Sequence, residues 1–199
     1  MYHLERKYSL REMPSLESDQ WLEWANGPFF TDSLNPQRGL LLPWVPRGIF
    51  LAHAFTSEVT DGVMNPSTKH KVELLLARSR ASGFLVHCSL EREAWGKKTM
   101  LPEVLTRIDY REIEKASVLV AFPQTSQGVC IEIGWAGAMG KEICICWDLN
   151  KDTSIDLNGV LERLYCLGGI IPDLVLYDGR ESAPFMVERV VSRVKERLV

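Results

Sequence analysis

Short, nearly continuous apolar runs alternate with amphipathic stretches from residue 48 onward. The runs are rich in β-branched and aromatic residues, which is typical of parallel strands covered on both faces. The predicted strands are Ile49–Ala54, Phe84–Cys88, Val118–Phe122, Ile143–Trp147 and Leu174–Tyr177. The amphipathic stretches predict helices near residues 67–81, 102–116, 129–140, 155–167 and 184–198.

Five consecutive strand–helix units predict a single α/β domain over residues 48–199. Its core would be a doubly wound five-stranded parallel sheet, flavodoxin-like or Rossmann-like in type. In open sheets of this kind, ligands bind beyond the carboxyl ends of the strands. We therefore expect the functional residues in the loops that follow the strands, at residues 53–64, 89–101, 123–128 and 148–156.

Residues 1–47 do not continue this pattern. They hold three of the six tryptophans, Trp21, Trp24 and Trp44, among several prolines. So aromatic a segment is not typical of a disordered tail. We expect an N-terminal extension that packs on the outside of the domain, or alternatively an arm or lid over its own or a neighbouring active site.

Composition and charge narrow the function. The 199 residues are 46% hydrophobic and 25% charged, as in a folded globular protein, and the formal net charge is -3. This charge argues against a nucleic-acid binder that works by bulk charge. No apolar run is long enough to span a bilayer, and residues 1–30 carry charges throughout, so we expect a cytoplasmic protein without a membrane partner.

The cysteines fit a reduced protein core. Their number is odd, and most lie in or beside apolar runs. Cys144 and Cys146 share one face of a predicted strand, but no second Cys or His pair lies near them to complete a metal site. We expect neither a metal nor a cofactor. The five cysteines are Cys88, Cys130, Cys144, Cys146 and Cys166.

The segment Pro123–Lys141, PQTSQGVCIEIGWAGAMGK, joins a predicted strand to a predicted helix through a short polar loop. Backbone N–H groups near Gly128 and the hydroxyl of Ser126 can face an anion there, so the loop is a candidate phosphate cradle. It is not a Walker A loop, and it lacks the three glycines of the dinucleotide fingerprint.

Glu132 lies in the first turn or so of that helix, between two isoleucines. The helix dipole is expected to hold the carboxylate ionised while its apolar neighbours reduce its hydration. An ionised, poorly solvated carboxylate is a usable nucleophile. The alternative is a charge–dipole pair that only stabilises the helix.

A second segment, Glu91–Glu112, supplies side chains beyond the second predicted strand. Arg92 is a candidate anion ligand and Trp95 a platform for a planar base. Asp109 lies beside the apolar stripe of the next helix, where partial desolvation would let it keep a proton and act as an acid. The alternative is a solvated helix laced by ion pairs.

His53 and His87 stand at the ends of the first two predicted strands. Both are placed to point into the crevice above the sheet. The alternative interpretation is a pair of hydrogen-bonded structural imidazoles.

These motifs resemble the nucleoside 2-deoxyribosyltransferase superfamily. They are most similar to its nucleotide N-glycosidases, the CMP and hydroxymethyl-CMP hydrolases of nucleoside-antibiotic pathways of the mildiomycin and blasticidin S type. The resemblance covers about residues 48–165. It is carried by REAWG at residues 92–96, by Thr106, Arg107, Asp109, Glu112 and Ile113, by VAFP at residues 120–123 and by EIGWA with MGK at residues 132–141.

The resemblance implies roles for individual residues. Glu132 matches the nucleophile of the family, and Asp109 matches the acid that assists departure of the base. Ser126 falls where a serine binds the 5'-phosphate, and Phe50 matches an aromatic position that shapes the base pocket. Members are dimers or larger assemblies whose sites are completed by a neighbouring subunit, and Asn158 is the residue expected to cross that interface.

The loop after the first strand departs from the family. Members carry Gly-Gly-Pro-Phe-Arg, whereas residues 52–56 of this chain read AHAFT. His53 and Phe55 are therefore expected to contact substrate, and the charged donor of the loop is missing. Arg38 and Arg47 in the extension are candidate substitutes.

The sequence therefore predicts a metal-independent hydrolase that cleaves the N-glycosidic bond of a pyrimidine nucleoside 5'-monophosphate. CMP or a C5-substituted CMP would yield the free base and ribose 5-phosphate. Alternatives are a 2'-deoxyribosyltransferase or deoxynucleotide hydrolase and, from another class, a nucleotide-binding sensor without turnover. The sequence leaves open the base, the sugar and the size of the expected homo-oligomer.

Overall fold

The computed structural model describes residues 48–55, 57–98, 100–123, 126–151, 156–168 and 171–198. Five parallel strands form one sheet in the order β4-β1-β5-β6-β7. The strands are β1 (Gly48–His53), β4 (Leu85–Cys88), β5 (Val118–Phe122), β6 (Glu142–Asp148) and β7 (Asp173–Tyr177). The predicted fold class is confirmed, and the strand order is the flavodoxin-like one, with the reversal between β1 and β5.

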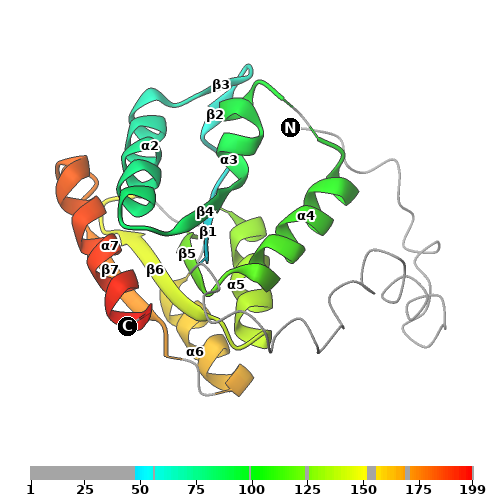
Figure 1. The fold of residues 1–199 in the computed structure, drawn as a ribbon, viewed down its shortest axis with the longest axis vertical. Helices are drawn as coiled ribbons and strands as arrows, with labels where there is room; N and C mark the ends of the chain where they lie inside the picture. Colours follow the sequence, from blue (N-terminus) through cyan, green and yellow to red (C-terminus); the bar gives the residue numbers. More distant parts are fainter. Residues whose placement is uncertain are drawn as a thin grey trace. The chain divides into compact units, whose positions relative to one another are not determined.

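Helices cover both faces of the sheet (Figure 1). Residues of α2 and α7 form one apolar core with one face of the sheet, and residues of α4, α5 and α6 form a second core with the other face. The covering helices are α2 (Pro66–Ala81), α4 (Pro102–Lys115), α5 (Gln127–Ala138), α6 (Leu157–Gly168) and α7 (Ala183–Leu198). All five predicted helices are therefore present.

Strand alternation assigns each apolar side chain to one of the two cores. In β1, Ile49 and Leu51 face the α2 and α7 side, whereas Phe50 and Ala52 face the α4, α5 and α6 side. Covering both faces explains why the strands read as continuous apolar runs.

The prediction that most of the cysteines lie in the core is confirmed for those whose side chains the structure describes. Cys144 and Cys146 share the α2 and α7 side as buried thiols, and Cys88 lies in the same core. Cys130 is partly exposed, and the side chain of Cys166 lies outside the described residues.

Two loops at the carboxyl end of the sheet contain small elements that the sequence did not predict. The loop after β1 holds the hairpin strands β2 (Val59–Thr60) and β3 (Val63–Met64), and the chain after β4 forms α3 (Ser89–Arg92) and the 3-10 helix η4 (Ala94–Gly96). The two loops pack together at Gly96, whose φ is +94° and where a Cβ would lie 2.8 Å from Cγ1 of Val59. Glycine adopts the positive φ readily and, because it has no Cβ, avoids the clash with Val59.

The predicted extension at residues 1–47, with its tryptophans, Arg38 and Arg47, lies outside the described residues. Within the described part of the chain, no helix is long and apolar enough to cross a membrane.

Candidate active site

The amino end of α5 begins directly beyond β5. Ser126 is the N-cap of this helix, and its Oγ accepts a hydrogen bond from the backbone N–H of Val129 at 3.3 Å. A serine in this position satisfies one of the backbone donors that a helix end leaves unpaired. The loop therefore ends in a helix terminus that faces the carboxyl edge of the sheet, two residues before the predicted start at residue 129.

A cavity of about 340 Å³ lies at this helix end. We call it the carboxylate cavity, because Glu93, Asp109 and Glu132 all line it. It combines these three acids with hydroxyl groups and apolar side chains from the loops after β1, β4 and β5. The remaining lining residues are His53, Phe55, Ser89, Met100, Leu105, Ser126, Gly128 and Val129.

Glu132 is half-buried in the second turn of α5. Burial raises its pKa to about 8, the negative charge of Asp109 adds to the increase, and the positive charge of Arg92 opposes it. The prediction that the helix dipole holds Glu132 ionised is therefore wrong. The dipole acts mainly within the first turn of a helix, and Glu132 lies beyond it.

Asp109 is buried on α4 and lies in an ion pair. Arg92 donates from Nη1 to Oδ1 of Asp109 at 2.7 Å and from Nη2 to Oε1 of Glu93 at 3.1 Å. The sequence predicted that Asp109 is desolvated enough to keep its own proton. The structure confirms the burial but adds a guanidinium that stabilises the negative charge of Asp109.

Arg92 is shared among several groups. Its Nη1 lies 3.3 Å from Nε2 of His87, and its buried Nε has no hydrogen-bond partner among the described residues. His87 in turn stacks on Phe50, with 5.2 Å between ring centroids and 14° between planes. Arg92 therefore holds the carboxyls of Asp109 and Glu93 but does not itself line the cavity.

Several predicted site residues do not line the carboxylate cavity. Phe50 is completely buried under His87, because the alternation of β1 turns it into the core. Trp95 has a positive φ of 61° and packs against the α2-side core, with Nζ of Lys69 5.4 Å from its ring centroid. The structure therefore does not place Trp95 as a stacking platform in this cavity.

Asn158 is exposed on α6, where its backbone N–H bonds to Oδ1 of Asp156. It does not line the carboxylate cavity of its own chain. Its predicted role across a subunit interface stays a prediction.

Glu93 is a cavity residue to which the sequence analysis assigned no role. It is buried, and burial raises the pKa of its carboxyl. Its place beside Arg92 in the REAWG motif, after the second predicted strand, was the available signal.

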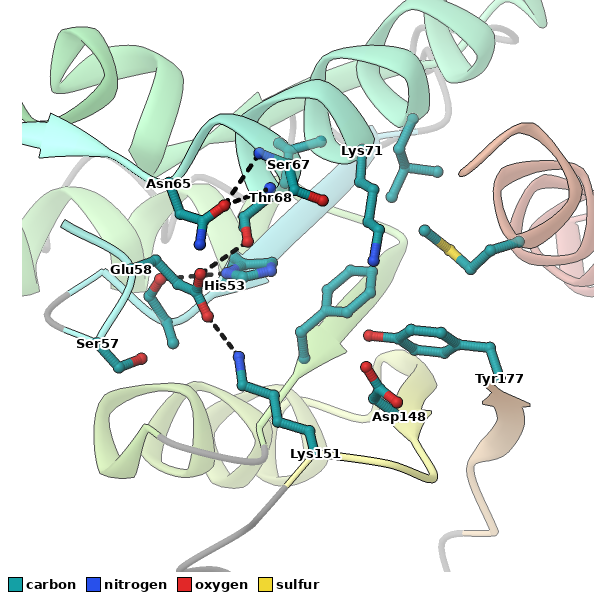
Figure 2. Close-up of a pocket in the computed structure, with 15 residues that line it drawn as sticks. His53, Ser57, Glu58, Asn65, Ser67, Thr68, Lys71, Asp148, Lys151 and Tyr177 are labelled. Carbon is teal, nitrogen blue, oxygen red and sulfur yellow. Dashed lines mark hydrogen bonds and ion pairs between the residues drawn. The ribbon is translucent and has the colours of Figure 1, made fainter. Parts of the chain in front are cut away.

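A second cavity, of about 330 Å³, lies on the α2 and α7 side of the sheet edge (Figure 2). We call it the lysine cavity, because Lys71 and Lys151 both extend into it. Its wall is formed by residues from α2, from the ends of four strands and from α7. The other lining residues are His53, Ala54, Ser57, Glu58, Asn65, Ser67, Thr68, Val72, Leu75, Phe122, Asp148, Tyr177 and Met186.

His53 lines both cavities. Its Nδ1 lies 3.1 Å from the carbonyl oxygen of Ala54, and its ring packs on Phe122 with 5.0 Å between centroids. Burial lowers the pKa of His53, so the ring is neutral near pH 7. This residue stands where the resembling family carries glycine.

Comparison with solved structures finds similar folds. The solution structure of BlsM is 27% identical with a TM-score of 0.52, covering 77% of this chain and 94% of that one. A conserved protein from Enterococcus faecalis V583 is 16% identical with a TM-score of 0.51, covering 76% and 99%. The CMP N-glycosidase BcmB from Clostridium botulinum is 23% identical with a TM-score of 0.48, covering 72% and 97%.

The likeness to BlsM and to the Enterococcus faecalis protein supports the same fold for this chain. No protein-family model matches the chain, and no curated protein matches it.

Proposed function

We propose that the protein is a nucleotide N-glycosidase that hydrolyses a pyrimidine nucleoside 5'-monophosphate, CMP or a C5-substituted CMP, to the free base and ribose 5-phosphate. The observation that carries the proposal is the placement of Glu132 and Asp109 in one cavity beside the Ser126 cap of α5. The sequence resemblance of residues 48–165 supports these roles, and the likeness to BlsM supports the fold.

The cavity chemistry suits cleavage of an N-glycosidic bond. The transition state resembles an oxocarbenium ion, so a carboxylate below C1' stabilises the developing positive charge and captures the sugar. The base departs more readily when it gains a proton. A site for this reaction needs one ionised and one protonated group, and the two carboxyls of Glu132 and Asp109 supply both.

One proton shared by the pair satisfies this need. In the free site the raised pKa of Glu132 favours its protonated form, and the carboxyl of Asp109 pairs with Arg92. When substrate binds, the proton passes to Asp109, which donates it to the leaving base while Glu132 forms a bond to C1'. Asp109 then takes a proton from water, whose oxygen attacks C1' and releases Glu132 and ribose 5-phosphate.

The decisive experiment is release of free base from a panel of ribonucleotides, deoxyribonucleotides and nucleosides, read by chromatography. We expect release from CMP or a C5-substituted CMP and little release from cytidine. Equal release from nucleotide and nucleoside would contradict the phosphate requirement, and no release from any member would overturn the activity. Addition of EDTA is expected to leave the rate unchanged.

Substitutions assign the two carboxyl groups. Glu132→Gln is expected to abolish base release while leaving nucleotide binding largely intact, and Asp109→Asn to lower the rate by about 100- to 10,000-fold. Glu114→Gln, an exposed neutralisation on the same helix as Asp109, is the matched control and should retain activity. Full activity in Glu132→Gln would exclude the mechanism.

The same assay separates a hydrolase from a transferase. A second pyrimidine base added to the reaction would become ribosylated or deoxyribosylated in a transferase, whereas a hydrolase yields only the sugar phosphate. Binding of nucleotide without release of base would identify the sensor.

A further inference from the structure

The lysine cavity offers hydrogen-bond donors that the protein itself does not use up. Nζ of Lys71 has one bond in the described structure, to the carbonyl oxygen of Gly179 at 3.3 Å, and no ion pair with a carboxylate of the described residues. An ammonium group carries three N–H donors. Lys71 therefore keeps a positive charge and donors that a ligand can engage.

The acceptors of this cavity are, in contrast, largely committed to the protein. The buried carboxylate of Glu58 accepts from the hydroxyl of Thr68 at 2.7 Å and from Nζ of Lys151. Oδ1 of Asp148 accepts from the backbone N–H groups of Gly179 at 2.9 Å and Asn150 at 3.0 Å. Glu58 and Asp148 are thus already engaged by donors of the protein, whereas Lys71 keeps N–H donors for a ligand.

The charges limit what can bind. The two lysines are balanced by Glu58 and Asp148, and Glu58 neutralises Lys151 directly. His53 adds no positive charge, because burial favours its neutral form. A cavity of this kind suits one oxyanion group facing Lys71, and not a polyphosphate.

We propose that the lysine cavity is a second binding site, in which Lys71 holds the phosphate or carboxylate group of a small ligand next to the carboxylate cavity, across the side chain of His53. Its volume of about 330 Å³ lies at the small end of the range for sites that take metabolites. The site goes beyond the proposed reaction, which uses only groups of the carboxylate cavity.

Isothermal titration of the full-length protein with inorganic phosphate, with ribose 5-phosphate and with malonate tests this site. The three probes separate a phosphate site from a carboxylate site. We expect at least one of them to bind saturably, and Lys71→Met to weaken that binding roughly tenfold to a hundredfold, the value of a hydrogen bond to a charged group. Lys71→Arg keeps the charge and should restore most of the affinity.

Lys69→Met is the matched control. It removes one positive charge from the same helix, but Lys69 pairs with Glu73 and lies over Trp95 outside the cavity. Equal affinity in Lys71→Met and Lys69→Met, or no saturable binding of any probe, would overturn the proposal. Binding that is lost in Ser126→Ala and kept in Lys71→Met would move the anion to the carboxylate cavity and equally overturn it.

The proposed N-glycosidase activity and the proposed second binding site can each be refuted independently of the other. Glu132→Gln should keep the Lys71-dependent binding although it releases no base. Loss of that binding would refute the second site without touching the assay for base release, and a protein without N-glycosidase activity would still show it.

Discussion

The position of Glu132 suits its proposed role in the reaction but leaves its carboxyl poorly solvated. Burial and the nearby charge of Asp109 raise its pKa to about 8, so the folded protein keeps a proton on a carboxyl that water would ionise. Groups with strongly raised pKa values gather at functional sites. Two measurements follow from this one residue.

The first is the pH dependence of kcat/KM for base release. If the Glu132–Asp109 pair needs one proton, activity falls about tenfold per pH unit once the pH exceeds about 8. The substrate phosphate loses its second proton near pH 6 and does not account for a limb at that position. A rate that rises through pH 8 would show that Glu132 acts as a nucleophile without a proton-carrying partner.

The second is stability. The folded-state pKa of Glu132 lies above its unfolded value of 4.5, so wild type loses stability as the pH rises from about 4.5 to 8. Glu132→Gln carries no such penalty and is expected to be more stable by roughly 1–3 kcal/mol at pH 8.5, with little gain at pH 5. Urea unfolding at the two pH values measures this, and an equal gain at both would contradict it.

At the amino end of α5, the hydroxyl of Ser126 has two roles, as the cap of the helix and as the proposed donor to the substrate phosphate. Oγ of Ser126 already accepts from the N–H of Val129, so only its O–H donor remains for a phosphate. Structural and binding effects of this residue are therefore mixed in a simple alanine variant, and two variants are needed to separate them.

Ser126→Ala should destabilise the protein by about 1 kcal/mol through loss of the cap, whereas Ser126→Asp keeps the cap acceptor and the stability. Both should raise KM for nucleotide and leave KM for nucleoside nearly unchanged, because aspartate repels the phosphate and alanine cannot donate to it. Thermal unfolding and the nucleotide-to-nucleoside ratio of kcat/KM measure the two effects. An unchanged ratio in both variants would remove Ser126 from phosphate binding.

The regular elements followed from the sequence, and the site followed only in part. Apolar runs and helical periodicity located the five strands and five covering helices, because burial dictates those patterns. The strands β2 and β3 have two residues each, too few for any period, and pack against the next loop where Val59 meets Gly96. The hydrophobic pattern of neighbouring residues does not reveal a contact between two separate loops.

The rest of the site could not be predicted because it depends on contacts between residues that lie far apart in the sequence. Glu132, Asp109 and Ser126, which line one cavity, were proposed as site residues because they stand in dense motifs. The lysine cavity was not, because Lys71 bonds to Gly179 across 108 residues. Phe50 was assigned to the pocket from the family resemblance and Trp95 from its place beyond a strand. Only the packed structure shows that Phe50 faces the core under His87 and that Trp95 packs beside Lys69.

At the scale of the whole molecule, the family resemblance implies that a neighbouring chain completes the site. If Asn158 reaches the carboxylate cavity of a partner, Glu132→Gln and Asn158→Ala are each inactive alone. Subunit exchange between them should restore about a quarter of wild-type activity, since half of the dimers then contain one intact site. Activity of Asn158→Ala by itself, or a monomer in light scattering, would contradict the shared site.

The wall that His53 provides to two cavities has a thermodynamic consequence. Any ligand that turns this ring while binding on one side alters the shape of the other side, so occupancy of the two cavities becomes linked. Linkage is reciprocal: a compound that tightens nucleotide binding tenfold must itself bind tenfold more tightly when nucleotide is present. A glycine at the end of β1 would leave no side chain to couple binding in the two cavities.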